Sequence, residues 1–225
     1  METKIFALKF GINTCYIIRN EGTIMIDGGP PNAINKFKKY LVEFGIDPKE
    51  IQLVVLTHAD FDHMGSATAI REITGAKIAV HENDRAILEE GQFNFPPGVN
   101  TWGKISHAIL SPLMHKAMIP SQKADIVLNA KEYPLNAYGI DGKIIHTPGH
   151  TAGSVSVLLN NKDAFVGCMA HNIRLFTLRP NLPIYAWDIG MIKESWKILL
   201  GQGAKMIYPG HGKPFPVEKI KKYLR

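Results

Sequence analysis

The chain has 225 residues, of which 45% are hydrophobic and 20% charged, and its net charge is +6. This composition is ordinary for a globular protein and excludes a disordered, collagen-like or coiled-coil chain. No apolar run approaches the roughly 20 residues that cross a bilayer, and no basic stretch precedes an apolar one at the start, so we expect neither a membrane span nor a signal peptide. The two cysteines, Cys15 and Cys168, cannot build a disulfide scaffold, which favours the reducing cytosol.

The excess of basic residues carries little functional information. A positive balance can indicate a nucleic-acid partner. The lysines are spread along the chain, however, with mild concentrations at 36–39 and 213–222 that are typical of solvated helix faces and ends. We therefore expect a small-molecule substrate, and no nucleic-acid or membrane partner.

Short strands and helices alternate along most of the chain. Apolar, β-branched segments bounded by turn residues predict strands at Lys4–Phe10, Thr14–Arg19, Thr23–Ile26, Ile51–Leu56, Lys77–Val80, Lys143–His146, Ser154–Leu159, Ala164–Val166 and Lys205–Tyr208. Helical spacing of apolar residues predicts helices over Asn32–Gly45, Ser66–Thr74 and Ile189–Leu200. This alternation indicates a layered α/β fold with helices covering sheets, in one domain over residues 1–225.

Residues 85–129 interrupt the alternation. They include a predicted helix, Gly103–Met118, that Pro112 would interrupt or kink. Long segments of this kind are often lids or binding loops, although an extra helix capping the core would explain the segment equally well. If it covers the site, Phe95, Trp102 and Ile105 favour a partly apolar substrate.

Metal-capable side chains crowd the loop after the buried strand Ile51–Leu56. His58, Asp60, Asp62 and His63 lie within six residues there. Imidazole and carboxylate both suit zinc, iron or manganese, and a loop can wrap such groups around an ion. A polar turn with a helix-capping aspartate and incidental histidines is the simpler alternative.

Two further histidines favour the metal site. His150 and His211 each occupy a Pro-Gly-His turn directly after a predicted strand. Each turn would present an imidazole from a strand end, and strand ends in a layered fold share one edge. With the first loop, these residues could hold a pair of metal ions.

The motifs together resemble the metallo-β-lactamase-fold hydrolases. That family has Thr-His-x-His-x-Asp-His on the first loop, then a Pro-Gly-His turn, an aspartate after a strand, and a late histidine, and the matches here run in order from Asp27 to His211. The resemblance implies a four-layer αββα sandwich with the site at one edge between two sheets. It also implies that one metal is bound by His58 and His150, and a second by Asp62, His63 and His211, with Asp27 supporting the loop.

Two positions depart from the family pattern. Asp60 stands in place of the second histidine; a carboxylate still binds zinc, iron or manganese, and the flavodiiron oxidoreductases of this fold have a glutamate there. Cys168 stands in place of the bridging aspartate, either as a thiolate ligand or as simple packing. Loss of the bridge could leave one metal well held and the other weak. His171, close by, could be a ligand or contact substrate, but a surface position is favoured.

These features favour metal-assisted hydrolysis. A divalent ion lowers the pKa of its bound water from 15.7 toward roughly 7, which makes hydroxide available at neutral pH. Asp62 is the residue expected to orient this nucleophile, and a small ester, thioester, lactone or amide is the expected substrate. The alternatives are an iron-dependent oxidoreductase or sulfur dioxygenase of the same fold, a phosphodiesterase or nuclease, and a metal-binding protein without turnover.

Overall fold

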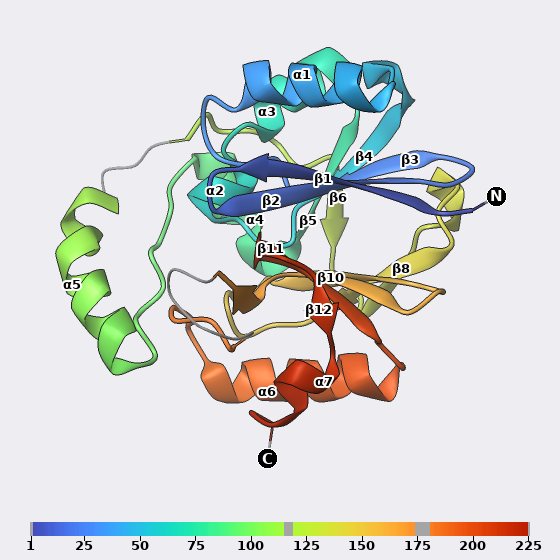
Figure 1. The fold of residues 1–225 in the computed structure, drawn as a ribbon. Helices are drawn as coiled ribbons and strands as arrows, with labels where there is room; N and C mark the ends of the chain where they lie inside the picture. The colour runs from blue at the N-terminus through green and yellow to red at the C-terminus, as the bar shows by residue number, and fades with distance from the viewer. Residues whose placement is uncertain (1, 115–118, 174–180, 225) are drawn as a thin grey trace.

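The computed structural model describes residues 2–114, 119–173 and 181–224, which are arranged in layers (Figure 1). Within them, twelve strands form a mixed sheet with two halves. The N-terminal half contains β1 (Lys4–Phe10), β2 (Asn13–Arg19), β3 (Thr23–Ile26), β4 (Ile51–Val55), β5 (Lys77–His81) and β6 (Ile126–Leu128). The C-terminal half contains β7 (Glu132–Pro134), β8 (Gly142–His146), β9 (Val155–Leu159), β10 (Asp163–Asn172), β11 (Met206–Gly212) and β12 (Phe215–Pro216). The halves meet where His211 of β11 pairs with Asn13 of β2.

Helices cover the outer faces of both halves. Helices α1 (Ile34–Phe44) and α3 (Ala67–Thr74) lie over the N-terminal half, and α6 (Ile189–Gly201) and α7 (Glu218–Lys221) lie over the C-terminal half (Figure 1). The predicted four-layer αββα sandwich is confirmed. Gly75 ends α3 with φ 76°, a left-handed conformation that glycine adopts without a Cβ clash.

Three apolar clusters separate the four layers. In the first, Phe37 of α1 packs with Met25 of β3. In the second, which lies between the half-sheets, Ile24 of β3 packs with Val157 of β9. The third contains the fully buried Trp196 of α6. Because neighbouring residues of a strand point to opposite faces and both faces are covered in the middle of the fold, β3 and β9 are buried along their whole length.

Two strands are longer than predicted, and the difference matters for the site. The sequence predicts strands that end at Val166 and Tyr208. In the structure the pairing of β10 with β11 continues past both positions through register shifts. The candidate ligands Cys168 and His211 therefore lie inside strands.

Both ends of segment 85–129 pack against the N-terminal half of the sheet. Helix α4 (Glu82–Glu90) packs against β5, and β6 pairs with β5 in parallel. In the sequence, α5 (Thr101–Met114) lies between α4 and β6, and it contains Pro112. The rest of the predicted helix, 115–118, is outside the described residues. Figure 1 shows α5 beside the layered body. No helix in the described ranges is long and apolar enough to span a membrane.

Candidate metal centre

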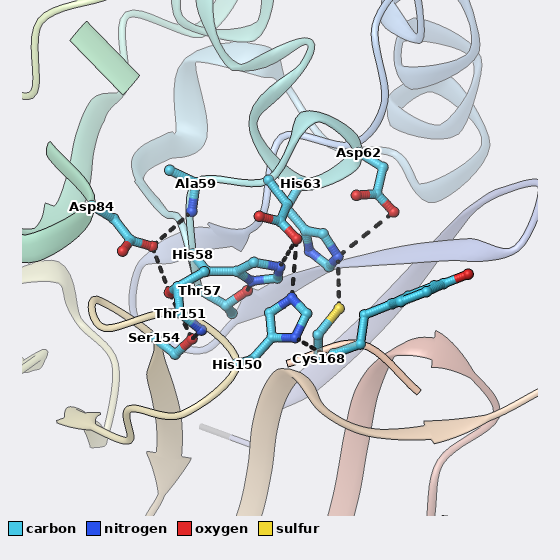
Figure 2. A network of polar contacts seen from close by, with 12 residues as sticks. Thr57, His58, Ala59, Asp62, His63, Asp84, His150, Thr151, Ser154 and Cys168 are labelled. Atoms are coloured by element: carbon cyan, nitrogen blue, oxygen red, sulfur yellow. Dashed lines mark hydrogen bonds and ion pairs between the residues drawn. The ribbon is translucent and has the colours of Figure 1, made fainter. Parts of the chain in front are cut away.

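The structure brings all seven predicted site residues together at one edge of the sandwich, and Figure 2 shows most of them. They are His58, Asp60, Asp62, His63, His150, Cys168 and His211. The first four follow β4 in the chain, His150 lies between β8 and β9, and the last two belong to β10 and β11. The predicted convergence is therefore present, but the predicted turn around His211 is part of strand β11, so only His150 comes from a Pro-Gly-His turn between strands.

Two groups of potential ligands share one residue. His58, His150 and Cys168 form the first group, and His63, Cys168 and His211 form the second. Within each group the ligand atoms lie within 4.8 Å of one another, and all five side chains are buried. Cys168 Sγ lies 3.3 Å from His63 Nε2. The cysteine thus occupies the place between the two groups where the resembled family has its bridging aspartate.

A carboxylate lies beside each group. Asp60 Oδ2 is 3.0 Å from His150 Nε2 and 3.4 Å from His58 Nε2. Asp62 Oδ2 is 3.4 Å from His211 Nε2 and 3.9 Å from His63 Nε2. Each group of three could therefore gain an oxygen ligand from the same short loop.

Hydrogen bonds from the far side of the rings orient the histidines. The Nδ1 of His63 lies 2.8 Å from the buried Asp27 carboxylate, the Nδ1 of His150 lies 2.9 Å from the Tyr185 carbonyl oxygen, and the Nδ1 of His211 lies 3.3 Å from the carbonyl oxygen of Ile12. Because these oxygens are acceptors, each Nδ1 donates to its partner and each Nε2 is directed into the site. Metal-ligating histidines are commonly held in this way.

Asp27 also fixes the loop that carries the ligands. Its Oδ1 accepts hydrogen bonds from the Thr57 backbone N–H at 2.7 Å and from the Thr57 hydroxyl at 2.9 Å. Asp27 itself has φ 62°, an uncommon conformation for a residue other than glycine. This agrees with the supporting role that the family resemblance implied for Asp27.

The centre fits a divalent metal ion. The buried Nε2 of His58 makes no hydrogen bond within the described residues, although the Asp60 carboxylate lies 3.4 Å away. A buried polar atom without such a bond costs free energy, and a coordinated ion would remove that cost. Imidazole nitrogen, thiolate sulfur and carboxylate oxygen together make a donor set that zinc accepts.

Charges in the centre favour the ligating forms of Cys168 and Asp60. Burial by itself raises the pKa of the Cys168 thiol, but the surrounding imidazoles, led by His63 and His211, outweigh burial and hold this pKa well below its ordinary value. Burial likewise raises the pKa of Asp60, and the charge of His58 and a hydrogen bond with His150 reverse the effect and lower it. A thiolate is the form of cysteine that binds metal.

Asp84, which no sequence motif singles out, ties two site loops together. From the first turn of α4, its buried carboxylate accepts hydrogen bonds from Ala59 N at 3.0 Å and Thr151 Oγ1 at 2.7 Å (Figure 2). It also accepts one from Gly153 N at 2.9 Å. A Cβ on Gly153 would lie 2.4 Å from Asp84 Oδ1, so glycine allows this approach. An acidic residue in the first turn of a helix is already explained by its favourable interaction with the helix dipole. The sequence therefore gives no sign that Asp84 also anchors two loops.

His171 is buried, and the surface position favoured from the sequence is wrong. The residue is 8% exposed, because β10 extends past Cys168 and carries it inward. Its ring centroid lies 4.9 Å from that of His211, and its Nε2 makes no hydrogen bond within the described ranges.

A cavity of about 330 Å³ opens onto the centre. Asp60, Asp62, His150, Cys168, His171 and His211 line its polar end. Its walls come from aromatic and aliphatic residues of segment 91–114 and of the chain around Ile184. This volume is at the lower end of the roughly 300–1,000 Å³ of small-molecule sites.

Comparison with known proteins agrees with this geometry. A sequence model of the metallo-beta-lactamase superfamily matches residues 8–211. A probable metallo-hydrolase of Methanocaldococcus jannaschii is 31% identical over 88% of this chain and 86% of its own length. A probable metallo-hydrolase of Bacillus subtilis is 26% identical over 68% of this chain, and the match spans 63% of that protein.

Solved structures show the same fold. The crystal structure of the B3 metallo-beta-lactamase BLEG-1 superposes with a TM-score of 0.70 at 21% identity, over 97% of this chain and 95% of that one. An archaeal superfamily protein from Sulfolobus tokodaii superposes with a TM-score of 0.69 at 21% identity, over 98% of this chain and 84% of that one. At this level of identity the likeness concerns the fold alone.

Proposed function

Since the chain belongs to the metallo-β-lactamase superfamily, we propose that it is a metal-dependent hydrolase of a small ester, thioester, lactone or amide. One observation carries the proposal: two buried groups of metal-capable side chains share Cys168 at the polar end of a cavity sized for a small molecule. The metallo-hydrolase relatives support the reaction type but say nothing of the substrate.

The residues suggest how one or two ions would be held. His58, His150 and Asp60 would hold the first ion, and His63, His211 and Asp62 the second, with the Cys168 thiolate between them. A divalent ion bound there supplies a hydroxide nucleophile at neutral pH, because it lowers the pKa of its water to about 7. The imidazoles and thiolate favour zinc, whereas the two carboxylates also suit iron or manganese.

Asp62 is the proposed catalytic residue. Its side chain lines the cavity and remains 19% exposed, while the neighbouring His63 is fully buried. The carboxylate can therefore orient an attacking water toward a carbonyl carbon, and it can also accept the proton of that water if only the first ion is bound. In this proposal the four histidines only hold the ions, and all four have a partner at Nδ1, which for His58 is the Thr57 hydroxyl at 2.9 Å.

The test is metal analysis followed by a substrate panel. Protein reconstituted separately with Zn²⁺, Fe²⁺ and Mn²⁺ is assayed against thioesters, lactones, carboxylic esters, β-lactams and phosphodiesters, with chelator-treated protein as the control. We expect turnover of a carbonyl compound by at least one metal form and none by the chelated protein. Turnover of phosphodiesters alone, or equal rates with and without metal, would contradict the proposal.

An iron-dependent oxidoreductase is the second candidate, and Asp60 is the observation that favours it. Its carboxylate lies against two histidines of one group and makes that group richer in oxygen, which suits iron. Oxygen consumption by the iron form, without hydrolysis by any form, would favour this candidate.

The proposal includes a cytosolic location. Both cysteines are free and buried, and free thiols are typical of reducing compartments. Cell fractionation with an antibody against the protein tests this directly.

A further inference from the structure

Apart from the candidate ligands and His171, the cavity is lined mostly by aromatic and aliphatic side chains. The apolar lining includes Phe61, Phe93, Phe95, Trp102, Leu110 and Met114. Among the lining residues that the structure describes, the charged side chains other than histidine and cysteine are the carboxylates Asp60 and Asp62, and none is lysine or arginine.

A series of aromatic rings leads from the ligand loop to α5. Phe61, which lies between the two carboxylates in the sequence, has its ring 5.4 Å from that of Phe93. Phe93 lies 6.0 Å from Phe95, and Phe95 lies 4.7 Å from Tyr185. Contacts at these centroid distances are ordinary for packed aromatic side chains. The apolar wall is thus continuous from the reacting end of the cavity to its rim.

Helix α5 forms the outer part of this wall and is docked at its N-terminal end. A Cβ on Gly103 would lie 2.3 Å from the Ile184 carbonyl oxygen, so the two backbones are in direct contact. Ser106 Oγ also lies 2.6 Å from the Tyr185 hydroxyl. One side of α5 therefore faces the cavity with Trp102 and Leu110. Ile105, predicted from the sequence to favour an apolar substrate, does not line the cavity and is 51% exposed.

We propose that this cavity selects substrates with an uncharged, apolar acyl chain, which lies along Phe93, Phe95, Trp102 and Leu110 while the carbonyl carbon faces Asp62. The assignment rests on the proposed hydrolase function and names its substrate class. In the reaction, water adds to the carbonyl carbon, the C–O, C–S or C–N bond breaks, and the products are a carboxylic acid and an alcohol, thiol or amine that takes the remaining proton. A chain ending in a carboxylate would meet an apolar wall and two aspartates, and is expected to be rejected.

The first test compares acyl chains on metal-loaded protein. The substrates are the 4-nitrophenyl esters of acetate, butyrate and hexanoate, together with the mono-4-nitrophenyl ester of adipate, which matches hexanoate in length but ends in a carboxylate. We expect kcat/KM to rise about two- to fourfold per methylene, the gain for burying apolar surface, and the adipate ester to be at least about tenfold poorer than hexanoate. Equal kcat/KM for acetate and hexanoate, or for hexanoate and adipate, would overturn the proposal.

Two tryptophan variants locate the effect. Trp102 lines the cavity and Trp187 does not, yet the two are 55% and 56% exposed, which makes Trp187 a matched control. Trp102→Ala should lower the ratio of hexanoate to acetate kcat/KM by about fivefold, since part of the apolar wall is lost, and Trp187→Ala should leave the ratio unchanged. Equal changes in both variants would contradict the placement of the chain.

A binding experiment separates this inference from the hydrolase proposal. Hexanamide and its carboxylate-ended counterpart, adipamate, are titrated into the metal-loaded protein by calorimetry, with acetamide as the short control. We expect hexanamide alone to bind measurably, and to bind more weakly to Trp102→Ala. Binding of hexanamide without hydrolysis of hexanamide itself or turnover of any ester, thioester or lactone would remove the hydrolase proposal and keep the chain selectivity. Turnover of these substrates without hexanamide binding would do the reverse.

Discussion

The metal centre and helix α5 face each other across one cavity, but different forces hold them. The side chains of the centre are almost wholly buried, and the rings of His63, His150 and His211 each have a second partner that fixes their orientation. Within Thr101–Met114, Gly103 is the buried residue, whereas Ile109 and Leu113 are 72% and 70% exposed.

This contrast separates chemistry from selectivity. Reacting groups have to keep their positions to within fractions of an ångström, and strand ends and buried hydrogen bonds provide that. A helix docked at one end can differ in sequence or position without disturbing the layers, and such segments often determine what binds. Changes in the centre should therefore affect turnover of every substrate, whereas changes in α5 should affect the choice among substrates.

The largest effect is expected for Asp62→Ala. Loss of the residue that positions the attacking water should lower kcat/KM by about 10³-fold. The sequence predicts a loop here, but Asp62 lies in the four-residue helix α2 (Phe61–Met64); because its side chain is partly exposed and outside the apolar core, the melting temperature should stay within about 2 °C of the wild type. Kinetics and thermal melts check both, with Glu43→Ala, on the exposed face of α1, as the control. Near wild-type turnover in Asp62→Ala would show that another residue has this role.

Asp84→Ala should destabilise the centre without touching a ligand. It leaves three buried donors, on Ala59, Thr151 and Gly153, without their acceptor, which should cost about 3 kcal/mol of the free energy of unfolding. Metal affinity should fall as well, because the loops carrying His58 and His150 lose their shared anchor. Urea unfolding and metal titration measure these effects. Glu82→Ala, in the same helical turn but exposed, should change neither the free energy of unfolding nor the metal affinity. An equal loss of stability in that variant would mean that Asp84 acts only through the helix dipole.

Cys168 variants test the link between the two ligand groups. We expect the wild type to hold its two metals unequally. Cys168→Ala should weaken metal affinity at the poorer site by at least about tenfold, since even the loss of an outer-shell partner has an effect of that size. Cys168→Asp should raise the metal content toward two per chain. Elemental analysis after dialysis against graded chelator gives these numbers. Two tightly bound metals in the wild type, with no change in Cys168→Ala, would mean that the cysteine only packs.

Gly103→Ala tests the other side of the comparison. The new Cβ cannot sit 2.3 Å from the Ile184 carbonyl oxygen, so α5 has to shift, at a cost of about 1–2 kcal/mol. We expect turnover of the hexanoate ester to fall several-fold while turnover of the acetate ester stays the same. Gly201→Ala, where a Cβ meets nothing within 4 Å, is the matched control. A parallel loss for both esters would mean that α5 supports the centre itself.

The smallest effect is a pH dependence from His81, outside the ligand set. Burial first, and then the stacked ring of His146 at 3.8 Å, lower the pKa of His81 to about 4. Because the folded pKa lies below the unfolded value of about 6.5, the contribution is complete above pH 6.5 and is lost as pH falls toward 4. Part of the pair is open to solvent, so we expect about 1 kcal/mol between pH 7 and 5.

His81→Asn is the variant that isolates this term. Asparagine can still accept the hydrogen bond from Asn83 N that His81 Nδ1 accepts at 3.2 Å and so keep the helix cap. The loss of stability from pH 7 to 5, measured by urea unfolding, should be smaller in the variant than in the wild type. Identical losses would show that other groups carry the acid sensitivity.

The sequence by itself determined the parts of this protein that are local. Continuous apolar runs marked strands covered on both faces, and the closely spaced residues from His58 to His63 marked a metal loop, because neighbouring residues on one loop must lie near one another. The two Pro-Gly-His turns placed His150 and His211 at the same edge, since strands of a layered sheet share their ends. The family resemblance supplied the number of layers.

Only the tertiary structure decided how distant segments meet. That Cys168 lies between both ligand groups depends on the register of β10 against β11, which continues past Gly167. That Asp84 anchors Thr151, 67 residues away, depends on how α4 packs beside the turn after β8. The burial of His171 and the outward position of Ile105 depend on the same kind of placement. Periodicity along a chain reports which side of a segment is apolar, but only packing between segments determines what that side contacts.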